Sequence, residues 1–224
     1  LKGAELAIKA GARKLTMPIS ASREHSLSNI GKTPEEAIEE VHRVCALRDS
    51  TSVERRPTIE IGISTAFGCT LEGTISEDWV IEMAGRLAKA GADGIGLSDT
   101  TGYANPSQIK RMFRRLRGEI GEKKMAGAHL HNTRGQGLAN VVAALDVDVT
   151  TFDSSLGGLG GCPFAPGATG NIVTEDLVFM LEAMGLHTGI DLDTLIATRE
   201  VLLTGLPDEV IYGNVPEAGL PKGF

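Results

Sequence analysis

Short apolar segments alternate with amphipathic segments along most of this chain, and the alternation limits the folds that it can adopt. The apolar segments are rich in β-branched residues, which predicts strands, and each is followed by a segment with helical periodicity. Strands joined through single helices and short loops run parallel, with right-handed crossovers. The predicted strands are residues 14–20, 58–66, 93–98, 125–130 and 147–152, and the predicted helices begin near residues 33, 76, 105, 137 and 174.

Helix boundaries are marked clearly in several places. Thr33-Pro34-Glu35-Glu36 has the pattern of a capping box with proline in the first turn. Asn105-Pro106 repeats the capped-proline start. The segments 6–12 and 87–92 are similar to each other: each predicts a helix end, a glycine stop and an immediate buried strand. This weak internal repeat supports repeated strand–helix units.

Polar side chains follow nearly every predicted strand. Functional groups that come from the ends of many strands are typical of a barrel, whereas an open doubly wound sheet concentrates them at one point. We therefore predict a TIM-type (β/α)8 barrel in a single α/β domain over residues 1–224, with a Pro/Gly-rich tail from about residue 205. Five strands are visible where a closed barrel has eight, so we expect three N-terminal strands to lie outside this sequence. The polar strand ends are Ser20, Ser22, Ser64, Thr65, Ser98, Asp99, Thr100, His129, His131, Asp153, Ser154 and Ser155.

Composition excludes several classes of partner. The net charge of −7 argues against nucleic acid, and the arginines at 111, 114, 115 and 117 are interpreted as a solvated helix face rather than a phosphate site. No apolar run approaches the length of a membrane span, and no signal pattern opens the chain. Three cysteines without paired spacing indicate a reducing compartment, so we expect a cytoplasmic protein.

His129 and His131 are two residues apart on one predicted strand, so their side chains point to the same face. Two imidazoles placed in this way can meet at one metal ion, although one core histidine and one loop histidine would give the same pattern. Asn171 is a candidate amide-oxygen ligand, with capping of the following helix as the alternative.

Residues 157–171 are rich in glycine and proline, and they predict a loop that can approach a ligand closely. Cys162 lies in this loop, which favours a proton donor or nucleophile over a packing role. Asp99 is a candidate for proton transfer or for orienting a metal ligand, with loop capping as the alternative. Glu175 and Asp176 lie in a first helical turn, where the helix dipole already favours carboxylates.

These motifs together resemble the 3-hydroxy-3-methylglutaryl-CoA lyase family. The resemblance rests on Gly160-Gly161-Cys162-Pro163-Phe164-Ala165, Gly170-Asn171 and Thr174-Glu175-Asp176-Leu177, and it extends through Leu97-Ser98-Asp99-Thr100, the histidine pair and Asp153-Ser154-Ser155. The related isopropylmalate and homocitrate synthases share the histidines and the Gly-Asn pair but usually lack the Gly-Cys-Pro element. The resemblance therefore favours a carbon–carbon lyase.

The resemblance implies that His129, His131 and Asn171 bind a divalent cation, Mg²⁺ or Mn²⁺. It also implies catalytic roles for Cys162, His129, Asp99 and Glu175. The family's fourth ligand, an aspartate beside a substrate-binding arginine, has no counterpart in this sequence.

The implied reaction is retro-Claisen cleavage of 3-hydroxy-3-methylglutaryl-CoA to acetyl-CoA and acetoacetate, a step of leucine degradation. A related acyl-CoA such as citramalyl-CoA, or an inactive fragment, is the alternative. An acyl-CoA thioester and a second copy of the chain, in a dimer, are the expected partners.

Overall fold

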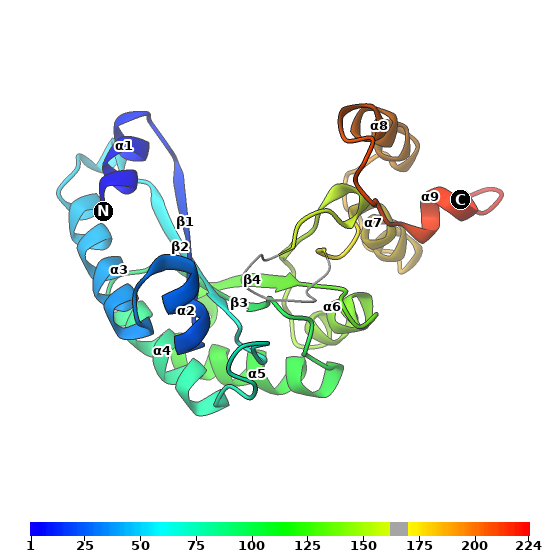
Figure 1. Ribbon diagram of the computed structural model, residues 1–224. Helices are drawn as coiled ribbons and strands as arrows, with labels where there is room; N and C mark the ends of the chain where they lie inside the picture. Colours follow the sequence, from blue (N-terminus) through cyan, green and yellow to red (C-terminus); the bar gives the residue numbers. More distant parts are fainter. Residues whose placement is uncertain (162–169) are drawn as a thin grey trace.

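A parallel sheet of five strands in the order β1-β2-β3-β4-β5 organises the fold, and helices cover its outer face (Figure 1). The computed structural model describes residues 1–161 and 170–224. Every strand pairs in parallel with its neighbour in sequence, as the strand–helix alternation predicts. The strands are β1 (Lys14–Ser20), β2 (Thr58–Ser64), β3 (Gly94–Asp99), β4 (Met125–Leu130) and β5 (Phe152–Asp153).

The helices follow the strands in the predicted order, with short 3₁₀ turns at Val53–Arg55, Glu122–Lys124 and Leu156–Gly158. None of the helices in the described part of the chain is long and apolar enough to cross a membrane. The helices are α1 (Lys2–Lys9), α2 (Arg23–Ile30), α3 (Pro34–Asp49), α4 (Glu77–Lys89), α5 (Pro106–Ile120), α6 (Gly137–Leu145), α7 (Thr174–Ala183), α8 (Leu192–Gly205) and α9 (Asn214–Ala218).

The predicted helix starts are confirmed by their hydrogen bonds. The Glu36 backbone N–H donates to Oγ1 of Thr33, and the Thr33 N–H donates to the Glu36 carboxylate, which completes the capping box. Ser76 caps α4, and Asn105 caps α5 ahead of Pro106. These side chains satisfy backbone donors that the first turn of a helix leaves unpaired.

Strand alternation divides the sheet into two different faces. In β2, Ile59, Ile61 and Ile63 are fully buried toward the helices, where Met112 and Phe113 of α5 belong to the same core. The opposite face carries small and polar residues, among them Gly62, Ser64, Gly96, Ser98 and Gly127. An ordinary TIM barrel fills this interior with branched side chains. Here the small residues leave room for a cavity.

Two sequence predictions need correction. The predicted strand at 147–152 is reduced to Phe152–Asp153, because the chain leaves α6 through a turn in which Asp148 has a φ of 60°. Val147 and Val149 are buried in the core without pairing in the sheet, which explains their strand-like sequence. Helices α2, α8 and α9 were not predicted; α8 occupies residues just before the predicted tail, and α9 lies within it.

Substitutions at two glycines should distinguish the tightly packed interior of the sheet from the exposed surface of a helix. A Cβ atom at Gly96 would lie 2.6 Å from the carbonyl oxygen of Gly127, whereas a Cβ atom at Gly118 on α5 would meet nothing within 4 Å. We expect Gly96→Ala to lower the free energy of unfolding by about 1–3 kcal/mol. Gly118→Ala should raise it by up to about 1 kcal/mol, through helix propensity. Urea denaturation of both variants measures the difference, and equal stabilities would contradict this description of the interior.

Candidate active site

A cavity of about 400 Å³ lies on the inner face of the sheet and extends to the carboxyl ends of the strands, and we call it the strand-end cavity. His129 and His131 line it from the end of β4, as their spacing predicts, and Asn171 lines it from the segment after the glycine-rich loop. Hydroxyl-bearing residues and one carboxylate complete the polar part of the wall: Thr16, Ser64, Ser98, Thr100 and Asp153.

The two histidines face each other. Their Nε2 atoms are 3.2 Å apart, and the ring planes meet at 68° with centroids separated by 5.1 Å. Because metal–nitrogen bonds in proteins are about 2 Å long, nitrogens at this separation can contact one ion. The two side chains therefore lie on the same face and close together, as their spacing predicts.

Asn171 reaches the histidines through backbone pairing of residues 170–174. The Ile172 N–H donates to the Leu130 carbonyl, and the Asn132 N–H donates to the Gly170 carbonyl. On the other side, the Thr174 N–H donates to the Ser155 carbonyl. The segment therefore continues the sheet beyond β5 while it also pairs with the end of β4.

The side-chain amide of Asn171 has a fixed orientation. Its Nδ2 donates to the Leu159 carbonyl at 3.0 Å, and its Oδ1 is buried without a hydrogen-bond partner among the described residues. A buried amide oxygen without a partner is costly unless a ligand compensates it. The alternative role as a helix cap is excluded, because Val173 is the N-cap residue of α7.

These observations fit a divalent cation held by His129, His131 and Asn171. Two imidazole nitrogens converge, and one amide oxygen beside them lacks a partner. Within the described residues, no group of three or more His, Cys, Asp and Glu side chains is arranged to hold a metal. A site here depends on the amide as its third ligand.

Asp153 orients His129. The two residues are neighbours in the register of β4 and β5, and Asp153 Oδ2 lies 3.5 Å from His129 Nδ1. The imidazole lowers the pKa of the Asp153 carboxyl by hydrogen bonding. A carboxylate at Nδ1 favours the tautomer that leaves Nε2 available to a metal. The sequence placed Asp153 at a strand end without assigning it this contact.

Asp99 points away from the cavity. Its neighbours Ser98 and Thr100 line the strand-end cavity, and alternation along β3 directs Asp99 to the helix side. Asp99 Oδ1 accepts hydrogen bonds from the backbone N–H groups of Tyr103 and Ala104, at 2.8 and 3.1 Å. This is the loop-capping role that the sequence left open.

Glu175 also lies outside the wall of the cavity. Its side chain is fully buried, and Oε1 accepts a hydrogen bond from Arg199 Nη1 at 2.6 Å. Both carboxylate oxygens also accept from the Gly157 N–H. Cys162, the remaining predicted catalytic residue, lies outside the described residues.

The sequence profile of the HMGL-like family matches residues 1–202. The chain belongs to the HMGL-like family. The resemblance found in the motifs is thereby confirmed, and so is the predicted fold class.

Two curated relatives and one solved structure illustrate the relationship. The hydroxymethylglutaryl-CoA lyase of Bacillus subtilis is 37% identical over 199 residues, which cover 89% of this chain and 65% of that protein. The (R)-citramalyl-CoA lyase of Chloroflexus aurantiacus is 40% identical over 203 residues, 90% of this chain and 62% of that protein. This chain therefore spans slightly less than two thirds of both relatives.

The solved structure is an HMG-CoA lyase of Acinetobacter baumannii in complex with coenzyme A and 3-methylmalate. It superposes with a TM-score of 0.91 at 40% identity, and the match covers all of this chain and 71% of that one. The HMGL-like architecture thus extends over the whole length of this chain.

The pKa of Asp99 predicts a pH-dependent stability. Burial raises this pKa from 3.8 to about 6. The native state therefore binds the proton more tightly than the unfolded state, and stability contributed by Asp99 is present below pH 4 and is lost as the pH rises to about 6. The shift corresponds to about 3 kcal/mol.

Asp99→Asn should remove this component. We expect the unmutated protein to lose a few kcal/mol of unfolding free energy, relative to the variant, between pH 4 and pH 7. Urea denaturation at each pH measures this difference. Parallel pH profiles for the two proteins would contradict the assignment.

Proposed function

We propose that this chain forms the metal-binding part of a carbon–carbon lyase that cleaves 3-hydroxy-3-methylglutaryl-CoA to acetyl-CoA and acetoacetate. The observation that carries the proposal is the convergence of His129, His131 and Asn171 in one cavity of an HMGL-like chain. The acyl-CoA class of substrate is supported by a similar lyase solved with coenzyme A.

The cleavage breaks the bond between the carbon that carries the hydroxyl and the methylene next to the thioester. The hydroxyl loses its proton and becomes the ketone of acetoacetate, while the bonding electrons pass to the thioester enolate. A proton delivered to the enolate carbon yields acetyl-CoA. A divalent cation bound at the histidines and the amide supplies Lewis acidity that polarises substrate oxygens.

The protein's own groups account for substrate binding and for delivery of the proton to the enolate carbon. The hydroxyls of Ser64, Ser98 and Thr100 offer hydrogen bonds to the carboxylate and carbonyl oxygens of the acyl group. Asp153 holds the ring of His129 in place. Cys162 is assigned as the proton donor to the enolate on the strength of its motif, since a thiol in such a loop can act as a general acid.

Citramalyl-CoA is the alternative substrate, favoured by the 40% identity to a citramalyl-CoA lyase. Its cleavage gives acetyl-CoA and pyruvate, so the ketone product separates the two functions. The cytoplasmic location and the dimer remain predictions from the sequence.

The decisive assay incubates the full-length protein and Mn²⁺ with each thioester, then identifies the ketone by chromatography. We expect acetoacetate from 3-hydroxy-3-methylglutaryl-CoA, at a kcat/KM at least about tenfold above that for citramalyl-CoA. Preferential formation of pyruvate would instead identify the protein as a citramalyl-CoA lyase. Absence of acetyl-CoA from both substrates would contradict a lyase.

Removal of either histidine should weaken metal binding. We expect His129→Ala and His131→Ala to lower Mn²⁺ affinity at least about tenfold, because each removes one of few ligands. His187→Ala is the matched control, since His187 is 90% exposed and does not line the cavity. Isothermal titration calorimetry measures the affinities, and unchanged affinity in both cavity variants would refute the metal assignment.

Replacement of Cys162 should separate chemistry from packing. Cys162→Ser should lower kcat on the order of a hundredfold, the scale of a lost general acid, and leave the melting temperature nearly unchanged. Cys45→Ser should do the reverse, because Cys45 is only 1% exposed in the core and a buried hydroxyl there would lack a partner. A Cys162→Ser variant with full kcat and a lowered melting temperature would make the loop thiol structural.

A further inference from the structure

A buried ion pair joins four separate segments next to the active site. Arg199 on α8 donates from one nitrogen, Nη1, to Oε1 of Glu175 at 2.6 Å and to the Tyr212 carbonyl at 2.8 Å. Glu175 accepts from the Gly157 N–H, and the Tyr212 N–H donates back to the Gly157 carbonyl at 2.7 Å. We call this closed ring of hydrogen bonds the tail clamp.

The residues of the tail clamp are buried and closely packed. The side chain of Glu175 is fully buried, and that of Arg199 is 11% exposed. A Cβ atom at Gly157 would lie 2.8 Å from Cβ of Ile211, and one at Gly213 would lie 3.2 Å from Arg199 Nη1. The neighbouring Asp176 holds the same tail, through the backbone N–H groups of Asn214 and Val215.

A short path leads from the tail clamp to Asn171. Leu159, two residues after Gly157, accepts the hydrogen bond from Asn171 Nδ2. A Cβ atom at Gly170 would lie 1.4 Å from the Gly158 carbonyl oxygen, so these two backbones are in direct contact. A shift of residues 157–159 would therefore move Asn171, whose position sets the third candidate ligand.

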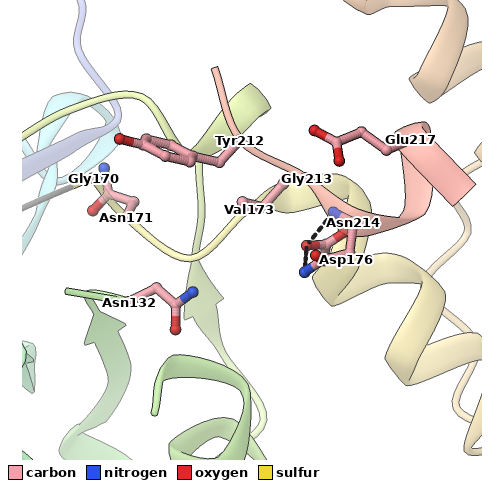
Figure 2. Close-up of a pocket in the computed structure, with 10 residues that line it drawn as sticks. Asn132, Gly170, Asn171, Val173, Asp176, Tyr212, Gly213, Asn214 and Glu217 are labelled. Atoms are coloured by element: carbon pink, nitrogen blue, oxygen red, sulfur yellow. Dashed lines mark hydrogen bonds between the residues drawn. The ribbon is translucent and has the colours of Figure 1, made fainter. Parts of the chain in front are cut away.

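The tail and Asn171 also line one cavity together. Tyr212, Gly213, Asn214 and Glu217 line a second cavity of about 250 Å³ that shares Asn171 with the strand-end cavity. Figure 2 shows Tyr212 and Asn171 on one side of this cavity and Asp176 with Asn214 on the other. These tail residues lie beyond residue 202, where the match to the family profile ends.

Buried ion pairs generally contribute little net stability, because desolvation of the charges offsets their attraction. Among the described residues, neither Arg199 nor Glu175 lines the strand-end cavity, so neither is placed to contact a bound ligand there. Both observations are explained if the ion pair positions neighbouring segments rather than stabilising the fold.

We propose that Arg199 is a positioning residue. Through Glu175 and the Tyr212 carbonyl it fixes the tail against residues 157–159, and so it holds Asn171 in the place where the active site requires it. The expected effect on kcat rests on the proposed function, whereas the expected effect on local structure does not.

The primary test compares Arg199→Met with a matched ion-pair variant in the full-length protein. Arg111→Met is the control, because Arg111 makes an equally short 2.6 Å pair with Glu77 on the outer surface between α4 and α5. Hydrogen exchange followed by mass spectrometry reports on each segment separately. We expect Arg199→Met, and not Arg111→Met, to accelerate exchange at residues 155–160 about tenfold or more, with strands β1 to β3 unchanged.

Activity provides the second readout. Arg199→Met should lower kcat on the order of a hundredfold with little change in KM, because small displacements of reacting groups have effects of this size. Arg199→Lys should recover most of the activity, since one nitrogen makes both contacts and an ammonium carries three donors.

A double variant separates positioning from stability. Glu175→Met/Arg199→Met removes both charges, so no unpaired ion remains buried and the melting temperature should recover toward that of the native protein. Exchange at residues 155–160 should remain fast and kcat low, because the tail is still unattached. Glu175→Gln/Arg199→Gln serves the same purpose if the methionine pair fails to fold.

The proposal would be overturned if the double variant recovered slow exchange and kcat together with its stability. It would also be overturned if Arg199→Met and Arg111→Met behaved identically. Absence of lyase activity in the native protein would refute the proposed function alone. The positioning role of Arg199 would then be tested by hydrogen exchange and by Mn²⁺ affinity. Arg199→Met should lower this affinity, because it displaces Asn171.

Discussion

The candidate active site depends on one piece of backbone pairing, that of residues 170–174 with two neighbours at once. Ile172 pairs with Leu130 at the end of β4, and Thr174 pairs with Ser155 after β5. Glycine is required at position 170, because any side chain there would overlap the Gly158 carbonyl. This pairing brings Asn171 beside histidines that are forty residues away in sequence, and it leaves the amide oxygen buried and available.

The small residues inside the sheet serve the same arrangement. Gly62, Gly96 and Gly127 occupy positions where a TIM barrel usually carries branched side chains, and Gly96 and Gly127 closely approach the backbone of the next strand. The helix-facing side of the strands supplies the hydrophobic core instead. The protein thus places its hydrophobic core on the outer face of the sheet and a polar cavity on the inner face. Such a division allows a polar cavity without a loss of core.

Much of this arrangement could be predicted from local sequence, because it depends on local rules. Strand–helix alternation fixes a parallel sheet, and the spacing of His129 and His131 fixes their common face. Other features depend on contacts that no local pattern reveals. The direction of Asp99 follows from where β3 begins its alternation, and the contact of Asp153 with His129 follows from strand register. Arg199 lies in a helix that the sequence did not predict. The local pattern around its partner Glu175 is that of a first-turn carboxylate, and the family resemblance implied a catalytic role rather than an ion pair.

The proposed metal site requires His129 and His131 to share one ion, and the nuclear spins of their nitrogens can report this directly. Pulsed electron paramagnetic resonance of Mn²⁺ bound to the full-length protein detects imidazole nitrogens attached to the metal. We expect nitrogen couplings from two imidazoles in the unmutated protein and from one in either single His→Ala variant. A spectrum of bound Mn²⁺ without nitrogen coupling would contradict the proposed metal site, because the ion would then lie somewhere other than at the carboxyl end of β4.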